Sequence, residues 1–93
     1  MTAAEGEVVV SIAGEVDISN VPELSDCVRT ALAEGPRRMV VDASAVTFAD
    51  SSAISLWLQW SMAVPEFELR EPSVLLRAVI TTMGLSDQLG LRS

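Results

Sequence analysis

The sequence contains no lysine, no histidine and no tyrosine, and it has a single cysteine, Cys27. Without histidine or lysine, a Ser-His-Asp or Ser-Lys hydrolase is excluded. One cysteine cannot form an intramolecular disulfide, and without histidine it leaves no good soft-metal site. Its isolated glycines form no phosphate-binding loop. We therefore expect no catalytic residue, no cofactor and no metal.

Positive charge is also scarce. The chain has 13 acidic residues against 6 arginines, which gives a formal net charge of −7. Nucleic-acid binding relies on clustered positive charge, so this balance argues against a nucleic-acid partner. It favours a protein partner with a basic surface instead.

Long apolar runs are absent as well. No run approaches the ~18 residues that suggest a membrane span, and residues 1–6 lack the features of a signal peptide. We expect a cytoplasmic protein without direct membrane insertion. With 93 residues and about half of them apolar, residues 1–93 are expected to form one domain.

The first half of the chain alternates between strand and helix patterns. Residues 7–12 and 15–17 favour extended structure. Ser19 or Asn20 can cap a one-faced helix that Gly35 ends, and Cys27 is predicted to be a buried core thiol of this helix. Residues 39–41 are apolar without alternation, which predicts a strand covered on both faces that Asp42 ends.

The second half repeats the alternation. Residues 53–64 are apolar nearly all round, which predicts a helix that is buried on more than one side or faces a partner. Phe67 and Leu69 alternate with charged residues, as in a half-exposed strand. Ser73 can cap a last helix, and residues 85–93 are predicted to be a docking tail.

Asp50, Ser51 and Ser52 lie between the buried strand and the apolar helix. At a helix start, main-chain amides lack intrahelical partners, so the two hydroxyls can either cap the helix or carry an anionic group. The turn is therefore a candidate phosphorylation switch or a plain helix cap. Asp42 and Asp50 can be imagined as paired carboxylates, but the simpler interpretation is that Asp42 ends a strand and Asp50 supports the turn.

The two tryptophans lie one helical turn apart. We interpret Trp57 and Trp60 as core residues, and the alternative is that they anchor a protein partner.

Several segments together carry a family resemblance. Gly14-Glu15-Val16-Asp17, Pro22-Glu23-Leu24, Glu34-Gly35-Pro36-Arg37-Arg38 and VVDASAVTFADSS occur in an order and spacing that resemble the STAS domain of bacterial anti-sigma factor antagonists. The resemblance covers residues 7–90. It implies an α/β fold with a small mixed sheet of four to five strands and about three helices packed largely on one side. It also implies that residues 1–5 are a reduced leading strand or that this strand is missing.

The same resemblance implies a switch. A partner anti-sigma factor with serine kinase activity would phosphorylate Ser51, with Ser52 as the second choice. When Ser51 is unphosphorylated, such a protein binds the anti-sigma factor and frees the sigma factor. The implied partner-binding residues are Asp17, Ser19, Asn20, Asp50, Ser51, Ser52 and Ala53.

The residues that follow the Asp-Ser-Ser turn depart from the family pattern. Ala53 and Ser55 stand where family members usually have glycine, which stiffens the helix start. Two other functions stay open: a STAS subunit of a lipid or other transporter that docks on its ATPase, and a scaffold or sensor-complex module. A second copy of the chain is a further candidate partner.

Overall fold

The computed structural model describes residues 2–91, which alternate between strands and helices. The predicted ends at Met1, Arg92 and Ser93 lie outside these described residues. The elements in chain order are β1 (Thr2–Ala4), β2 (Glu7–Val16), α1 (Val21–Ala33), β3 (Arg38–Ala49), α2 (Ser51–Ala63), β4 (Glu66–Arg70) and α3 (Val74–Thr82).

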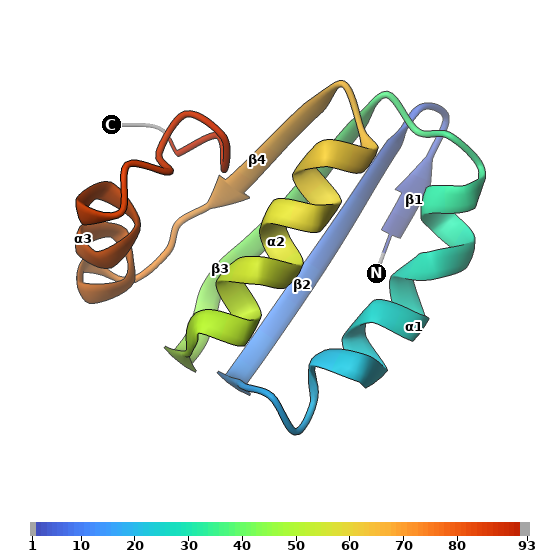
Figure 1. Cartoon of the computed structure of the whole chain (residues 1–93). Coiled ribbons are helices and arrows are strands. Elements are labelled where there is room, and N and C mark those ends of the chain that lie inside the picture. The colour runs from blue at the N-terminus through green and yellow to red at the C-terminus, as the bar shows by residue number, and fades with distance from the viewer. Residues whose placement is uncertain (1, 92–93) are drawn as a thin grey trace.

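The strands form one mixed sheet in the order β1-β2-β3-β4. β1 pairs antiparallel with β2, whereas β2 with β3 and β3 with β4 are parallel. The two parallel connections run through α1 and α2, which lie over the same face of the sheet, while α3 lies beyond the end of β4 (Figure 1). The predicted α/β fold, with a mixed sheet and three helices among the described residues, is confirmed.

The core lies between the sheet and its helices. On β2, Val8, Val10 and Ile12 are buried, because alternate strand residues face the same side. On β3 the core residues are Met39, Val41, Ala43 and Val46, and the change of spacing after Ala43 follows a register shift in the pairing with β2. From α2, Trp57 and Trp60 are 0% and 3% exposed and belong to the same core cluster. Their interpretation as core residues is confirmed, and the burial of large apolar side chains supplies most of the favourable free energy of folding.

Two predictions about strand boundaries are wrong. Residues 15–17 are not a separate extended piece, because β2 runs without interruption to Val16. Asp42 does not end β3, which continues to Ala49 by pairing with β2. Pairing with a neighbouring strand outweighs the low strand propensity of Asp42, Ala43 and Ser44.

The charged residues of β4 are also not all exposed as the alternation predicts. Glu68 is 6% exposed, because Arg38 from the neighbouring strand β3 and Arg70 from β4 itself cover it. Arg38 Nη2 lies 2.6 Å from Glu68 Oε1, and Arg70 Nε lies 3.0 Å from Glu68 Oε2.

Cys27 is exposed, so the prediction of a buried thiol is wrong. On α1 the buried residues are Val28 and Ala31, and Cys27 lies one position to the side of this face. A single position on a helix turns a side chain by about 100°, enough to move it from the core to the rim.

The tail after α3 docks as predicted over residues 85–91. Leu89 is fully buried, and its carbonyl oxygen accepts a hydrogen bond of 2.8 Å from the amide of Leu69 on β4. The tail therefore covers the free edge of β4. No helix within residues 2–91 has the length and apolar character needed to cross a membrane.

Candidate functional site

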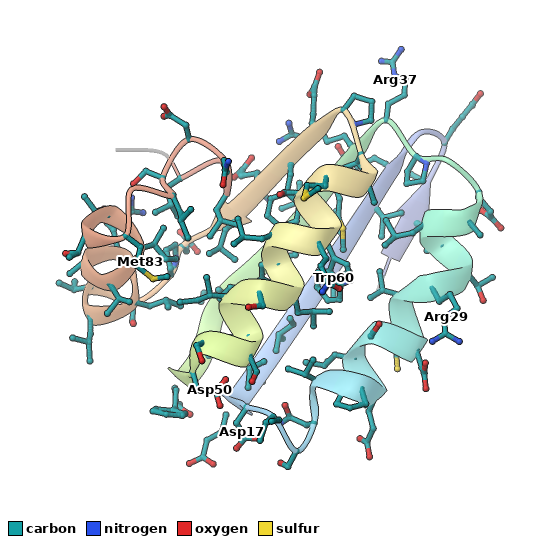
Figure 2. All side chains as sticks on the ribbon, viewed as in Figure 1. Asp17, Arg29, Arg37, Asp50, Trp60 and Met83 are labelled. Carbon is teal, nitrogen blue, oxygen red and sulfur yellow. The ribbon has the colours of Figure 1, made fainter. Side chains whose placement is uncertain are left out.

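The candidate site lies where β2 and β3 end side by side. Val16 pairs with Ala49 in the parallel register, and the Asp50 amide donates to the Val16 carbonyl oxygen at 3.2 Å. The carboxyl ends of parallel strands meet at one edge, which is a frequent place for binding sites in α/β folds. Asp17 and Asp50 therefore lie near one another at this end of the sheet, and Arg37 lies at the opposite end (Figure 2).

Asp50 is the N-cap of α2. Its backbone is extended, and its Oδ1 accepts hydrogen bonds from the amides of Ser52 at 2.9 Å and Ala53 at 3.2 Å. These bonds satisfy two amides that the helix itself cannot. The helix accordingly begins at Ser51, two residues before the predicted start at Ala53.

The serines of the turn do not cap the helix, so the plain-cap interpretation is wrong. Ser51 is exposed and Ser52 is half-buried. Within residues 2–91, neither hydroxyl has a hydrogen-bond partner. Ser51 thus presents an uncommitted hydroxyl beside the Asp50 carboxylate.

Hydrogen bonds fix the loop between β2 and α1. Asp17 Oδ1 accepts from the amide and the hydroxyl of Ser19 at 2.9 Å and 2.5 Å. Asn20 Oδ1 accepts from the Asp17 amide at 2.9 Å, and Asn20 Nδ2 donates to the Glu15 carbonyl oxygen at 2.7 Å. The Ser19 hydroxyl and amide hold the pKa of the Asp17 carboxyl below its usual range.

The predicted cap of α1 has a different role. Asn20 occupies the N-cap position, but its side chain makes no cap bond because it holds the loop instead. Ser19 likewise bonds to Asp17. The helix start depends on the Asp17 carbonyl oxygen, which accepts from the amides of Asn20 and Val21.

The structure brings most of the predicted partner-binding residues together on one surface. Ala53 is the exception, because it is 0% exposed and its methyl group belongs to the core. Ala53 contributes only its main-chain amide, which bonds to Asp50.

Two exposed apolar residues were missed by the sequence analysis. Ile18 is 75% exposed in the Asp17 loop, and Phe48 is 54% exposed near the end of β3. Two features of the sequence could have identified them. Ile18 lies inside a polar turn, and Phe48 lies directly before the Ala-Asp-Ser turn. We define the strand-end surface as residues 17–20, Phe48 and residues 50–52.

The chemistry of this surface suits binding. It carries the carboxylates of Asp17 and Asp50 and the hydroxyls of three serines, with apolar side chains between them. None of its residues is an arginine, so an incoming basic group meets no repulsion here. Within residues 2–91, no cluster of three or more potential metal ligands occurs.

The fold and this surface define a small α/β domain that presents polar and apolar groups at the carboxyl ends of its parallel strands. The family model described as "Mlab, STAS domain" matches residues 1–92, so the chain belongs to the STAS domain family. No curated protein matches the chain.

A solved structure gives the same fold. The anti-sigma factor antagonist SpoIIAA in its unphosphorylated form superposes with a TM-score of 0.80 at 24% identity. The alignment covers 94% of this chain and 81% of that chain. The chain is therefore similar to SpoIIAA in architecture.

Proposed function

We propose that this chain is a protein-binding switch of the anti-sigma factor antagonist type. Its strand-end surface binds an anti-sigma factor when Ser51 is unphosphorylated and releases it when Ser51 is phosphorylated. The observation that carries the proposal is the exposed, unbonded Ser51 hydroxyl next to the capping carboxylate of Asp50. The domain acts by binding and not by catalysis, and an ATP-using kinase partner would place the complex in the cytoplasm.

The charge of the strand-end surface supports release on phosphorylation. A phosphate adds about −1.5 to −2 charges at neutral pH. The Asp50 carboxylate already occupies the amides of Ser52 and Ala53, so these amides are not free to neutralise the phosphate. The added charge would lie between Asp50 and a partner surface fitted to a neutral serine, and closing the interface would bury uncompensated charge.

Exposure favours Ser51 over Ser52 as the modified residue. A kinase must bring the hydroxyl into its own active site, and Ser51 is exposed whereas Ser52 is half-buried. The amide of Ser52 is also bound to Asp50, so withdrawing this residue would break the cap. Ser51, at the first position of α2, carries no such bond.

The test is incubation with a candidate anti-sigma kinase and ATP, followed by intact-mass measurement. We expect one phosphate on the wild type and on Ser52→Ala, and none on Ser51→Ala. We also expect Ser51→Glu to weaken binding of the anti-sigma factor. Absence of phosphate on the wild type, together with unchanged binding by Ser51→Glu, would refute the proposal. Phosphate on Ser51→Ala but not on Ser52→Ala would move the site to Ser52.

A second candidate function is a STAS subunit that docks on the ATPase of a transporter through the same surface. One observation favours it: the matching family model is described as "Mlab, STAS domain" and not as an anti-sigma factor antagonist. In this case Asp50→Arg would abolish binding to the ATPase subunit, and Ser51→Ala would leave it unchanged. Affinity measurements on purified pairs separate the two functions.

A further inference from the structure

The outer half of β3 is an unpaired sheet edge. β3 pairs with β4 only from Arg38 to Asp42, opposite Glu66 to Arg70. Beyond Asp42, residues 43–49 pair only with β2. On the other side, no described residue forms a main-chain hydrogen bond with them. Figure 1 shows β3 running past the end of β4. We call residues 43–49 the open edge.

The open edge is one of two stretches of the described sheet that lack a strand on one side, so its surroundings decide which of them can bind a partner. The tail covers β4, since the Leu69 amide donates to the Leu89 carbonyl oxygen at 2.8 Å. At the opposite edge β1 has only 3 residues and leaves residues 10–16 of β2 unpaired, but the pocket beside them is lined in part by Glu15 and Glu23. Proteins generally cover or shorten edge strands, because free amides and carbonyls are a template for another strand. An edge that stays open beside an apolar surface is therefore a candidate binding site.

An apolar groove of about 240 Å³ lies between the open edge and α3. The β3 wall includes Val46 and Phe48, and the α3 wall includes Leu75, Leu76 and Val79. Leu75 is 77% exposed although it lines this groove. A strand added to the open edge would place alternate side chains toward the groove and the others toward solvent, because successive side chains point to opposite faces.

The charged residues at the two ends of the open edge determine which side chains a bound strand can carry there. At one end the Asp42 carboxylate accepts a hydrogen bond of 3.0 Å from the Ser44 amide, so this amide is already satisfied. At the other end lies Asp50, whose carboxylate bonds only to main-chain amides among the described residues. A basic side chain at that end of a bound strand would complement Asp50 and the net charge of −7.

We infer that the open edge binds an extended segment of a protein partner by strand addition. The segment has large apolar side chains at alternate positions, which enter the groove, and an arginine or lysine at the end that meets Asp50. Main-chain hydrogen bonds would provide affinity, and the groove would select the apolar side chains. This surface shares Phe48 and Asp50 with the strand-end surface, but Ser51 does not line the groove, so strand addition can be tested separately from phosphorylation.

The test uses a panel of synthetic heptapeptides with Val, Ile, Leu or Phe at alternate positions and arginine at one end. Binding is followed by ¹⁵N–¹H NMR titration and amide hydrogen exchange. We expect shifts and slowed exchange along residues 43–49, and loss of binding when the alternate peptide amides that face the edge are N-methylated. Leu75→Glu should weaken binding by about tenfold or more, because it places a charge in the groove.

Val74→Glu is the matched control, because Val74 is 87% exposed on the same helix and does not line the groove. It should change the affinity by less than about twofold, within the range of surface substitutions. The inference is overturned if no peptide of the panel binds at millimolar concentration, if N-methylation has no effect, or if both glutamate variants behave alike. A dimer that Leu75→Glu dissociates, without peptide binding, would assign the open edge to a second copy of the chain.

Discussion

The Asp50 amide donates a hydrogen bond of 3.2 Å to the carbonyl oxygen of Val16, the last residue of β2. This bond joins the start of α2 to the loop that begins at Asp17. Since the Asp50 carboxylate also caps α2, one residue holds the helix, the strand and the loop together. The position of the Ser51 hydroxyl relative to the Asp17 loop is therefore set by main-chain and cap bonds.

Removing the Asp50 cap should destabilise the domain. Asp50→Ala leaves the Ser52 and Ala53 amides without their acceptor, which costs about 0.5–2 kcal/mol in free energy of unfolding. Asp50→Asn keeps an acceptor at the cap and should lose much less. Urea denaturation of both variants measures the difference. Ser51→Ala is the control, and a loss equal to that of Asp50→Ala would mean that the Asp50 carboxylate has no special role at the helix start.

The sequence was sufficient to predict the order of the elements and the docking of the tail. Periodicity and capping residues are local signals, so α1, α2, β4 and α3 could be placed without knowledge of the tertiary structure. The extent of β3 could not be predicted, because pairing with β2 carries it past Asp42. Glu68 was assigned to solvent for a related reason, since Arg38, one of its two arginine partners, reaches it only through the pairing of β3 with β4.

The spatial grouping of the candidate site residues was predicted in part, whereas their role in binding remains a prediction. Asp17, Ser19, Asn20 and Asp50 lie together as expected, because parallel strands end at one edge of the sheet. The sequence did not predict which residue of the turn caps α2, since aspartate and serine are both favourable at the N-cap position. Backbone geometry decides among them, and it gives the cap to Asp50.

The Asp17 carboxyl should titrate below its usual range. The Ser19 hydroxyl and amide stabilise the charged form and lower the pKa of Asp17 in the folded state. This contribution to stability is complete above the unfolded pKa of about 3.9 and is lost as the pH falls through the lower folded pKa. Carboxyl ¹³C NMR titration measures the shift. Ser19→Ala removes one donor and should raise the pKa of Asp17, and an unchanged value would show that the hydroxyl has no effect.

The buried Glu68 should contribute more to stability than the exposed Glu66, although both contact Arg38. Glu68 bonds to two arginines and its side chain is 8% exposed, against 68% for Glu66. Glu68→Gln should lower the free energy of unfolding by about 1.5–3 kcal/mol, the range for hydrogen bonds to charged groups.

Glu66→Gln is the control and should cost less than about 1 kcal/mol, because exposed ion pairs contribute little. Urea denaturation at low and high salt measures the free energy of unfolding of both variants. Equal losses would contradict a special role for Glu68, whereas a larger loss for Glu68→Gln that persists at high salt would support it, because buried pairs are screened less.

Gly90 should be the most sensitive glycine of the tail. A Cβ atom at this position would lie 2.0 Å from the Phe67 carbonyl oxygen, and the φ angle of 61° already disfavours a side chain. Gly90→Ala must therefore move the tail away from β4 and expose Leu89, with an expected loss of about 2–4 kcal/mol in free energy of unfolding. Gly84→Ala is the control, because Gly84 has a similar positive φ of 74° but no atom lies within 4 Å of its Cβ position. It therefore measures the cost of the backbone conformation without a steric clash. Gly84→Ala should cost about 1 kcal/mol.

Urea denaturation measures the loss of stability in both variants. Equal losses would mean that close packing of Gly90 against β4 does not hold the tail.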